Sequence, residues 1–307
     1  MYDSWKVIVN PHAGGGSCKI EWNDIEKLLQ TAEIAYTAEL TKGRYHAIDI
    51  AKSAFKEGYR KFIAVGGDGT IHEIVSGIVL IGEDTRDVTM AVIPVGTGND
   101  WGREWGITID HKQAIECIVR GNTRVQDLAE VHAMKGGKMN IVTMVNIGGL
   151  GFDANVSSNV NDSKDQGKYE KNMYLKTLIK TFLGYSNRQL KIVTNGKVFY
   201  DGKVFSTAFG IGKFSGGGMM QTPLARPDDS LLDITVIKKI PKIKVLFQIK
   251  KLFSGKILDI KQVIHTQAQS VKVTSWPPSK VEVDGEIVGF TPTSIKLLPL
   301  AIRVIVP

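Results

Sequence analysis

The stretch Gly66-Gly67-Asp68-Gly69-Thr70 carries the most information in this chain of 307 residues. It lies between Lys61–Val65, an apolar run that predicts a buried strand, and residues 71–78, whose apolar side chains recur at helical spacing. Glycines between a strand and a helix let the backbone approach a ligand closely, and the N–H groups at a helix start suit phosphate. The stretch therefore predicts a phosphate-binding loop. The alternative is a simple glycine-rich tight turn.

Asp68 is the unusual member of this loop, because a carboxylate repels a neighbouring phosphate. Three roles suit such a carboxylate: it orients a backbone loop, binds a cation, or contacts a hydroxyl group. The residues alone leave all three roles open.

The composition is that of an ordinary globular protein, with 43% hydrophobic and 23% charged residues. The net charge of +8 favours anionic partners such as nucleotides, nucleic acid or an anionic membrane surface. The first residues show no signal peptide, and no apolar run is long enough to span a bilayer. Cys18 and Cys117 are far apart, which predicts reduced thiols and a cytoplasmic location, and no Cys or His pair has the spacing of a zinc site.

The first part of the chain alternates between predicted strands and helices. Strands are expected at residues 5–10, 34–40, 61–65 and 88–93, and helices at 20–30, 45–57, 70–80 and 112–119. This alternation predicts an α/β domain, residues 1–123, with a parallel sheet covered by helices. Ligands of such sheets bind beyond the carboxyl ends of the strands. Glycine-bearing loops follow three of these ends, at residues 10–16, 66–70 and 94–100, and Thr41-Lys42-Gly43 follows a fourth.

From about residue 124 the pattern changes to apolar runs separated by turns. Strands are predicted at residues 124–131, 138–147, 189–194, 197–211, 231–237, 257–266, 270–275, 280–283, 294–298 and 301–306. Asn195-Gly196 and Asp284-Gly285 predict hairpin turns. Residues 124–307 are therefore expected to form a β-sandwich or β-rich domain, with a cleft between it and the first domain. Helices at 168–183 and 242–253 and a polar loop at 157–167 interrupt the strands.

Several nucleotide-binding signatures are missing. The chain has no P-loop, no Gly-x-Gly-x-x-Gly after its first strand, and none of the protein-kinase signatures. The glycines Gly96, Gly98 and Gly102 come close to the dinucleotide fingerprint, but the last follows one residue too late. A P-loop NTPase, a dinucleotide oxidoreductase and a protein kinase are therefore disfavoured.

Five motifs together resemble the diacylglycerol kinase catalytic family. They are Ile8-Val-Asn-Pro-x-Ala-Gly14, Val65-Gly-Gly-Asp-Gly-Thr-Ile-His-Glu73, Pro94-Val-Gly-Thr-Gly-Asn-Asp100, Gly149-Leu-Gly-Phe-Asp153 and Val283-Asp-Gly-Glu286. More narrowly, the chain is similar to the soluble bacterial diacylglycerol/lipid kinases, which are relatives of sphingosine and ceramide kinases. The glycine loop alone is shared with NAD kinases and has a counterpart in phosphofructokinases, so the resemblance implies their fold for the first domain.

The resemblance implies an ATP-binding cleft. The residues that would line it are Asn10, Pro11, His12, Ala13, Gly14, Gly66, Gly67, Asp68, Gly69, Thr70, Ile71 and His72, with Thr41 and Thr97 contacting the nucleotide from neighbouring strand ends. Backbone donors and small hydroxyls suit a polyphosphate. A threonine after a strand is often only a helix cap, and Thr41 and Thr97 keep that alternative.

The resemblance also implies that Asp284 and Glu286 lie at the catalytic end of the second domain, across the cleft from the catalytic loop that contains Asp68. Phosphoryl transfer to an alcohol needs an acceptor for the hydroxyl proton. Asp284 is the first candidate, as the base or as a member of a metal network, and Glu286 is the second. The alternative is structural, because Asp284-Gly285 is also a favoured turn sequence.

In this family a loop holds Mg²⁺ through one aspartate side chain and two backbone carbonyls. The matching groups are Asp229 and the carbonyls of Arg226 and Leu231, with Asp228 as an alternative ligand. Oxygen ligands of this kind suit magnesium. Ser230 stands where bacterial members often have glycine, and serine resists a left-handed backbone. A second Mg²⁺ would arrive with ATP.

Residues 238–256 interleave lysines with Ile, Leu and Phe, and residues 168–191 likewise mix lysines with apolar residues. A basic amphipathic helix suits an anionic membrane surface, but it equally suits a helix that packs its apolar side on the protein. No nucleic-acid partner is expected, because no recognised module accompanies the charge. Trp101 and Trp105 are expected to pack locally rather than to stack on adenine.

The sequence therefore predicts an ATP-dependent lipid kinase that transfers the γ-phosphoryl group to a lipid hydroxyl, most simply from ATP to diacylglycerol to give phosphatidic acid. It would be cytoplasmic and peripherally membrane-associated, would take its lipid from the membrane surface, and could form a homodimer through an exposed strand edge. One alternative is an NAD kinase-like phosphotransferase, which would carry an Asn-Glu pair where this chain has Gly98-Asn99-Asp100. The other is a non-catalytic nucleotide- or lipid-binding regulator, which the retained acidic residues disfavour.

Overall fold

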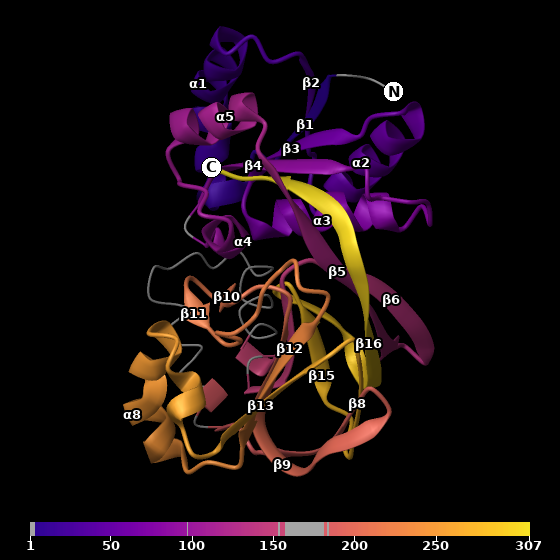
Figure 1. Cartoon of the computed structure of the whole chain (residues 1–307), viewed down its shortest axis with the longest axis vertical. Coiled ribbons are helices and arrows are strands. Elements are labelled where there is room, and N and C mark those ends of the chain that lie inside the picture. Colours follow the sequence, from indigo (N-terminus) through magenta and orange to yellow (C-terminus); the bar gives the residue numbers. More distant parts are fainter. Residues whose placement is uncertain (1–3, 97, 153, 157–180, 183) are drawn as a thin grey trace.

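A computed structural model describes residues 4–96, 98–152, 154–156, 181–182 and 184–307 (Figure 1). Its first half alternates strands and helices. The elements are β1 (Trp5–Val9), η1 (Ala13–Gly16), α1 (Ser17–Thr31), β2 (Tyr36–Leu40), α2 (His46–Glu57), β3 (Lys61–Gly66), α3 (Asp68–Val79), β4 (Thr89–Pro94), α4 (Asp100–Glu104) and α5 (His111–Arg120). The sequence pattern misses α4, because its five residues are too few to show a helical period.

The second half consists mainly of strands. They are β5 (Thr123–Lys135), β6 (Lys138–Met144), β7 (Ile147–Gly151), β8 (Arg188–Thr194), β9 (Lys197–Gly210), β10 (Phe214–Ser215), β11 (Met219–Met220), β12 (Leu232–Lys238), β13 (Val263–Ala268), β14 (Ser270–Ser275), β15 (Lys280–Val283) and β16 (Glu286–Ile305). The helix expected at 242–253 is α8 (Lys242–Phe253), and the short 3-10 helix η2 (Ile257–Asp259) follows it. None of the helices in the described ranges is long and apolar enough to cross a membrane.

Three strand predictions are wrong in detail. Residues 138–147 form two strands, β6 and β7, because the backbone turns at Val145 and Asn146. Residues 257–266 begin with η2 rather than with a strand. Residues 294–298 and 301–305 belong to the single strand β16, which continues through a shift of register near Leu300 and ends one residue before Val306. The polar loop expected at 157–167 and most of the helix expected at 168–183 lie outside the described residues.

One sheet of 14 strands connects the two halves of the described chain. Strands β2, β1, β3 and β4 pair in parallel, and β16 joins β4 in parallel through Arg303 and Val304. The other pairings of this sheet are antiparallel. A mostly antiparallel continuous sheet therefore replaces the separate sheets that the sequence pattern suggests. The reason is the length of β16, since 20 residues at roughly 3.3 Å each reach from one half to the other.

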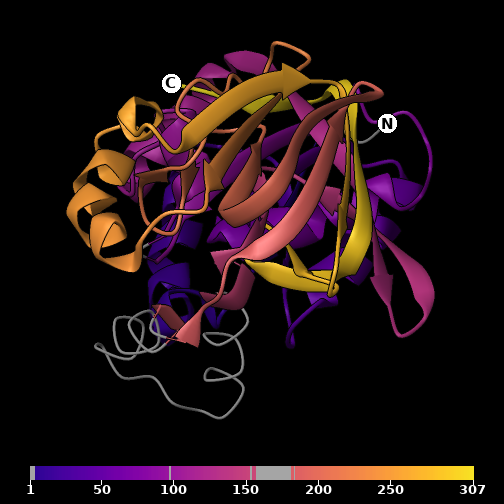
Figure 2. The same cartoon turned by 90° about the horizontal axis from the view of Figure 1, so that it is seen from below.

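The strands of the second half close on themselves. The pairings run from β7 through β15, β16, β14, β8 and β9 back to β7, and Figure 2 shows this half from below, with its strands curved around one another. The enclosed apolar core includes Leu150, Val204, Val281 and Ile295. The chain is thus a two-domain fold with a β-rich second domain.

The last strand also contributes to the core of the first half. Ile302, Val304 and Ile305 are buried in the same apolar cluster as Ile63 and Val92 of β3 and β4. The chain end therefore returns to the sheet that carries the glycine loops, and this return fixes β16 between the two halves.

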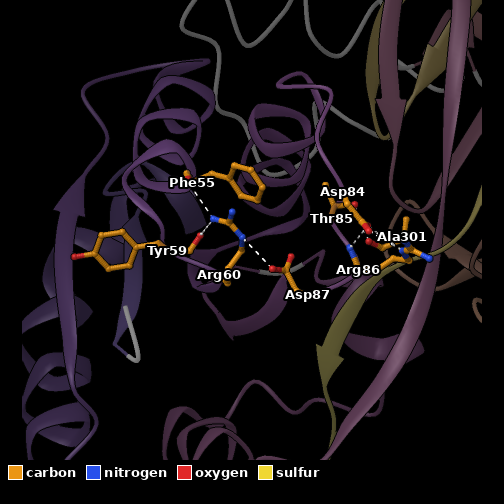
Figure 3. A network of polar contacts seen from close by, with 8 residues as sticks. All are labelled: Phe55, Tyr59, Arg60, Asp84, Thr85, Arg86, Asp87 and Ala301. Carbon is orange, nitrogen blue, oxygen red and sulfur yellow. Dashed lines mark hydrogen bonds and ion pairs between the residues drawn. The ribbon is translucent and has the colours of Figure 1, made fainter. Parts of the chain in front are cut away.

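Polar contacts stabilise the end of the sheet that lies opposite to the glycine loops (Figure 3). Arg60 donates to Asp87 Oδ2 at 3.1 Å and to two backbone carbonyls at the end of α2. Thr85 Oγ1 donates to the carbonyl of Ala301 at 2.7 Å, which ties the segment before β4 to β16. These groups lie where β3 and β4 begin, so they serve the fold rather than a ligand at the glycine loops.

Candidate active site

Three loops converge at the carboxyl ends of β1, β3 and β4. Asn10 Nδ2 donates to Thr70 Oγ1 at 3.1 Å, which joins the first loop to the start of α3. Gly14 and Gly96 have φ angles of 62° and 116°, in the region that favours glycine. A Cβ atom at Gly96 would lie 3.3 Å from the backbone nitrogen of Gly14. The first and third loops therefore touch through glycine backbone.

Open space adjoins these loops. Cβ atoms at Gly15, Gly16 and Gly69 would meet nothing within 4 Å. Helix α1 begins just after Gly16, and α3 begins at Asp68. The first N–H groups of a helix have no intrahelical partner and carry a partial positive charge. Two helix starts beside open glycine backbone suit a polyphosphate.

Asp68 orients the third loop. Its Oδ2 accepts a hydrogen bond from the backbone N–H of Asp100 at 3.0 Å, and its Oδ1 accepts one from Trp101 at 2.9 Å. These N–H groups belong to the first turn of α4, so Asp68, at the start of α3, caps a second helix. Burial raises the pKa of Asp68, and the two backbone hydrogen bonds oppose the rise. The contacts correspond to the first of the three roles considered for this carboxylate.

The other nucleotide-site candidates lie around the same loops. Pro11 and His12 form the turn after β1, where the backbone N–H of His12 donates to Asn10 Oδ1 at 3.1 Å, and Ala13 begins η1. The side chain of Ile71 is buried in the first core, so only its backbone is suited to contact a ligand. Thr97 lies outside the described residues.

Thr41 follows β2 and is buried, and its backbone N–H donates to the carbonyl of Val9 at 2.8 Å. The residue before α2 is Tyr45, and the carboxylate of Glu73 accepts the N–H groups of Tyr45 at 3.0 Å and Ala47 at 3.2 Å. Thr41 is therefore not the cap of this helix.

Asp284 lies in the hairpin turn between β15 and β16. Asp284 and Gly285 have φ angles of 48° and 92°, and Asn195 and Gly196 have φ angles of 47° and 80°. Both predicted hairpin turns are confirmed, since two successive positive φ angles are typical of such turns. The turn and a chemical role are compatible at Asp284, because the turn sets the backbone and leaves the side chain to make other contacts.

Four groups hold the Asp284 carboxylate. Oδ1 accepts the backbone N–H groups of Asn146 at 3.0 Å and Ile147 at 2.9 Å, and Oδ2 accepts that of Val145 at 2.8 Å. Nδ1 of His72 lies 2.8 Å from Oδ2. A carboxylate offers about four lone-pair positions, so these contacts occupy its acceptor capacity.

His72 belongs to the first turns of α3, next to the glycine loop. Burial lowers its pKa, but the hydrogen bond to Asp284 and the charges of Asp284, Glu286 and Glu73 together outweigh this effect, and the pKa of His72 is raised above its usual value. If Nδ1 of a neutral imidazole donates to Asp284, the lone pair is on Nε2. The pair therefore joins a titratable group of the first half to a fixed carboxylate of the second.

Glu286 has a different environment from Asp284. Its carboxylate forms an ion pair with Arg44, which lies in the loop after β2. The Glu286 side chain is 34% exposed, whereas that of Asp284 is 3% exposed. The second candidate base is thus engaged by a cation near the surface, and this ion pair is another contact between the halves.

Further contacts between the halves involve residues to which the sequence motifs assign no role. Asp100 Oδ2 accepts the backbone N–H of Gly217 at 2.7 Å, and Asp100 also pairs with Arg103. Lys213 Nζ lies 3.3 Å from Glu104 Oε1. The run Gly216-Gly217-Gly218, with three positive φ angles, is the sequence signal for this loop.

Gln126 connects the third loop to the turn that holds Asp284. Its Oε1 accepts the indole N–H groups of Trp101 at 2.9 Å and Trp105 at 3.1 Å, and its Nε2 donates to the carbonyl of Val145 at 2.8 Å. Both tryptophans are buried, which confirms that they pack locally.

The candidate metal loop turns at Ser230, whose φ of 62° is left-handed despite its side chain. Asp229 Oδ1 accepts the backbone N–H of Leu231 at 3.0 Å, and Asp127 Oδ2 accepts that of Ser230 at 2.7 Å. Burial and the nearby carboxylates of Asp233 and Asp228 raise the pKa of Asp229. This concentration of negative charge suits a cation.

Asp228, the alternative ligand, forms an ion pair with Arg124. Across the part of the chain that the structure describes, no three His, Cys, Asp or Glu side chains are grouped to hold a metal. A cation at this loop would therefore rest on Asp229 and on backbone carbonyls such as that of Arg226, which agrees with the donor chemistry that magnesium prefers.

Comparisons with known proteins match both halves. A model of the diacylglycerol kinase catalytic domain matches residues 4–131, and a model of the YegS C-terminal NAD kinase beta sandwich-like domain matches residues 146–306. The diacylglycerol kinase of Staphylococcus carnosus is 28% identical to this chain over 313 residues, which cover 98% of the chain and 94% of that protein.

Solved structures give the same result. A Bacillus anthracis structure, provisionally described as a diacylglycerol kinase, is 25% identical, has a TM-score of 0.77, and covers 99% of this chain and 97% of its own. Yeast NADH kinase in complex with NADH is 12% identical, has a TM-score of 0.55, and covers 99% of this chain and 83% of its own, a likeness of fold alone. The expected NAD kinase-like fold with a β-rich second domain is confirmed.

Proposed function

We propose a substrate and a division of labour on the premise that the chain belongs to the diacylglycerol kinase family and is an ATP-dependent lipid kinase. The acceptor we propose is diacylglycerol, and the product is phosphatidic acid. The observation that carries the proposal is the 2.8 Å contact between His72, beside the glycine loop, and the Asp284 carboxylate of the opposite half. It brings a proton-accepting pair next to the loops that suit a polyphosphate.

ATP would bind in a cleft between residues 1–123 and residues 124–307. Its phosphates would lie along the backbone of Asn10–Gly14 and Gly66–His72, with Thr41 and Thr97 at the neighbouring strand ends. The open space beside Gly15, Gly16 and Gly69 supports this placement. Asp68 would act through the third loop, because it holds the start of α4 in position.

The proton of the lipid hydroxyl would pass to the His72–Asp284 pair. Three backbone N–H groups fix the Asp284 carboxylate, so it is suited to hold the imidazole of His72 in one tautomer and to stabilise the imidazolium that forms. Nε2 of the neutral ring would be the atom that accepts the proton. Glu286 would support the site from outside, through its ion pair with Arg44.

Magnesium is the metal that we expect at the loop of residues 226–231. Asp229 and the carbonyls of Arg226 and Leu231 would hold it, and the nearby carboxylates of Asp233 and Asp228 support a cation there. Bound in this loop, Mg²⁺ would offset the clustered carboxylates and so stabilise the second half. A second Mg²⁺ would accompany the phosphates of ATP.

The enzyme would take its lipid from a membrane surface with which it associates peripherally. A homodimer, if it forms, has a described strand edge available at β6, which pairs only with β5 among the described strands. Light scattering on the purified protein measures the oligomeric state.

The test is incubation with radiolabelled ATP-Mg²⁺ and either a total lipid extract or NAD, followed by mass spectrometry of the labelled products. We expect label in phosphatidic acid. Label in another phospholipid would replace diacylglycerol as the acceptor, and label in NADP would support an NAD kinase. No transfer to either substrate would favour a non-catalytic regulator.

A further inference from the structure

Helix α8 carries apolar side chains on two opposite faces. Val245 and Leu252 pack against an apolar cluster of the second half. Ile243 and Phe247, one turn apart, are 62% and 77% exposed. With 3.6 residues per turn, this second pair lies on the side of the helix opposite to the first. A surface helix normally presents polar side chains there, so the exposed pair needs a partner.

Lysines surround the exposed pair. Residues 234–258 contain seven lysines and no Asp or Glu. On the helix itself, Lys244 and Lys250 are exposed and Lys251 is half-buried. Lys250 follows Phe247 by three residues, which places it on the same face. The face is therefore both apolar and strongly cationic.

The patch continues beyond the helix. A Cβ atom at Gly255 would lie 2.9 Å from Met220 Sδ and 3.9 Å from Pro223, so the segment after β11 packs beside the end of α8. Leu224 in that segment is 53% exposed, and Phe253 in the last turn of α8 is 49% exposed. We call Ile243, Phe247, Phe253, Leu224 and the three lysines at 244, 250 and 251 the α8 face.

We propose that the α8 face docks on a bilayer that contains anionic phospholipid. Lysines alone would suit a nucleic acid, and apolar side chains alone would suit a protein. Phenylalanine and isoleucine flanked by lysines match the interface of an anionic membrane, where rings enter the headgroup region and ammonium groups meet phosphate. The inference rests on the proposed function, since a kinase that phosphorylates diacylglycerol must collect its acceptor from a membrane.

A short path of contacts links this face to the glycine loops. The strands β10 and β11 lie between α8 and α4 (Figure 1). The backbone N–H of Gly217, between these two strands, donates to Asp100 Oδ2 at 2.7 Å, and the backbone N–H of Asp100 donates to Asp68 Oδ2 at 3.0 Å. A membrane at the α8 face would therefore lie next to the β10–β11 segment, which is joined to the phosphate-binding loops through Asp100.

The experiment measures co-sedimentation of the full chain with vesicles of phosphatidylcholine, with and without phosphatidylglycerol. The test variant is Ile243→Gln/Phe247→Gln. The matched control is Ile109→Gln/Val119→Gln, which removes two side chains of the first half that are 72% and 58% exposed. We expect the wild type to bind the anionic vesicles, and the test variant to lose at least about tenfold in partitioning, because burying each large apolar side chain is worth roughly a factor of ten. The control should bind like the wild type.

Two further readouts separate docking from catalysis. Phosphorylation of a water-soluble short-chain diacylglycerol should be unchanged in the test variant, because this acceptor is not taken from a bilayer. Unchanged vesicle binding by the test variant, or a change in its molar mass that identifies a contact between copies, would overturn the docking proposal. If the wild type phosphorylates no diacylglycerol but the variant still loses vesicle binding, the docking surface stands and the proposed function fails.

Discussion

Nδ1 of His72 lies 2.8 Å from Oδ2 of Asp284, although 212 positions separate the two residues in the sequence. His72 follows the glycine loop, and Asp284 lies in a hairpin turn of the β-rich half. The contact therefore depends on how the two halves are joined. It also makes the two residues testable as one unit, because a change in either should alter the behaviour of the other.

Asp284→Asn should lower the turnover number by about two orders of magnitude or more, the usual contribution of positioned proton transfer. The amide keeps the size of the side chain, but its NH₂ group cannot accept the backbone N–H bonds that one carboxylate oxygen now accepts. Initial rates of lipid phosphorylation, with circular dichroism as the test of folding, measure the effect. Glu286→Gln is the control and should cost less than about tenfold, since Glu286 acts through a partly exposed ion pair. Equal losses in the two variants would contradict the assignment.

The pH dependence of turnover should reflect His72. A proton-accepting imidazole must be neutral, so activity falls as pH drops through its pKa. Asp284 raises that pKa against the opposing effect of burial, which places the acid limb above pH 6.5, the usual value. In Asp284→Asn the main raising contributions are lost, while burial and the smaller effects of Glu286 and Glu73 remain, so the acid limb of the residual activity should move to lower pH. Rate profiles between acid and neutral pH check this, and an acid limb at the same pH in both proteins would argue against the pair.

Asp68→Asn should lower both stability and turnover. The carboxylate accepts two backbone N–H groups of α4 with separate oxygens, and an amide can accept them with only one. Loss of a cap of this kind costs about 0.5–2 kcal/mol of unfolding free energy. Denaturant unfolding and phosphorylation rates measure the two effects. Asp110→Asn is a matched control, because Asp110 caps α5 by accepting the N–H of Gln113 at 3.0 Å. Asp110→Asn should lower the unfolding free energy by no more than Asp68→Asn does, and it should keep full activity. If Asp68→Asn is fully active, the third loop does not need this cap.

Gly77→Ala should destabilise the first half. A Cβ atom at Gly77 would lie 2.4 Å from the carbonyl oxygen of Ile48, so α2 and α3 would have to move apart. Overpacking of this kind costs about 1–3 kcal/mol, which exceeds the gain of up to about 1 kcal/mol from alanine in a helix. Thermal unfolding of Gly77→Ala and of the control Gly102→Ala, where the nearest contacts would be an ordinary 3.8 Å, makes the comparison. A more stable Gly77→Ala would refute the close approach of the two helices.

The cysteines should be unreactive in the folded protein. Cys18 and Cys117 are both free and buried, and burial raises the pKa of the Cys18 thiol to about 11. Because the thiolate is the reactive form, a disulfide reagent at mildly alkaline pH should modify neither residue until denaturant is added. The absorbance of the chromophore that the reagent releases measures how many thiols have reacted. Rapid labelling of one thiol without denaturant would be the contrary result.

Much of the first half could be predicted from local signals. The glycines at positions 14, 66 and 96 mark the ends of apolar strands, and helical spacing resumes soon after the first two, so the loops and their likeness to a kinase family are visible in the sequence. The turn at Asp284-Gly285 is equally local, because two residues with positive φ angles have a recognisable sequence preference.

The contacts of the second half with the first could not be predicted in this way. The periodic pattern splits β16 at Pro299 and Leu300, whereas the backbone continues through a shift of register. The junction of β6 and β7 resembles the middle of a strand, yet the turn at Val145 and Asn146 and the first residue of β7, Ile147, supply three N–H groups to Asp284. These features depend on strand pairing between distant segments, which leaves no trace in local periodicity.

By itself, then, the amino-acid sequence determined the strands and the longer helices of the first half, the positions where only glycine fits the loops, and the kinase family to which the chain belongs. Each of these depends on residues that are close together in the sequence. Only the tertiary structure decided that β16 returns to pair with β4, that Asp284 meets His72, and that Ile243 and Phe247 of α8 point away from the protein core. The physical reason is that such relationships are set by the packing of segments hundreds of residues apart, where burial and backbone hydrogen bonding act on the whole chain at once.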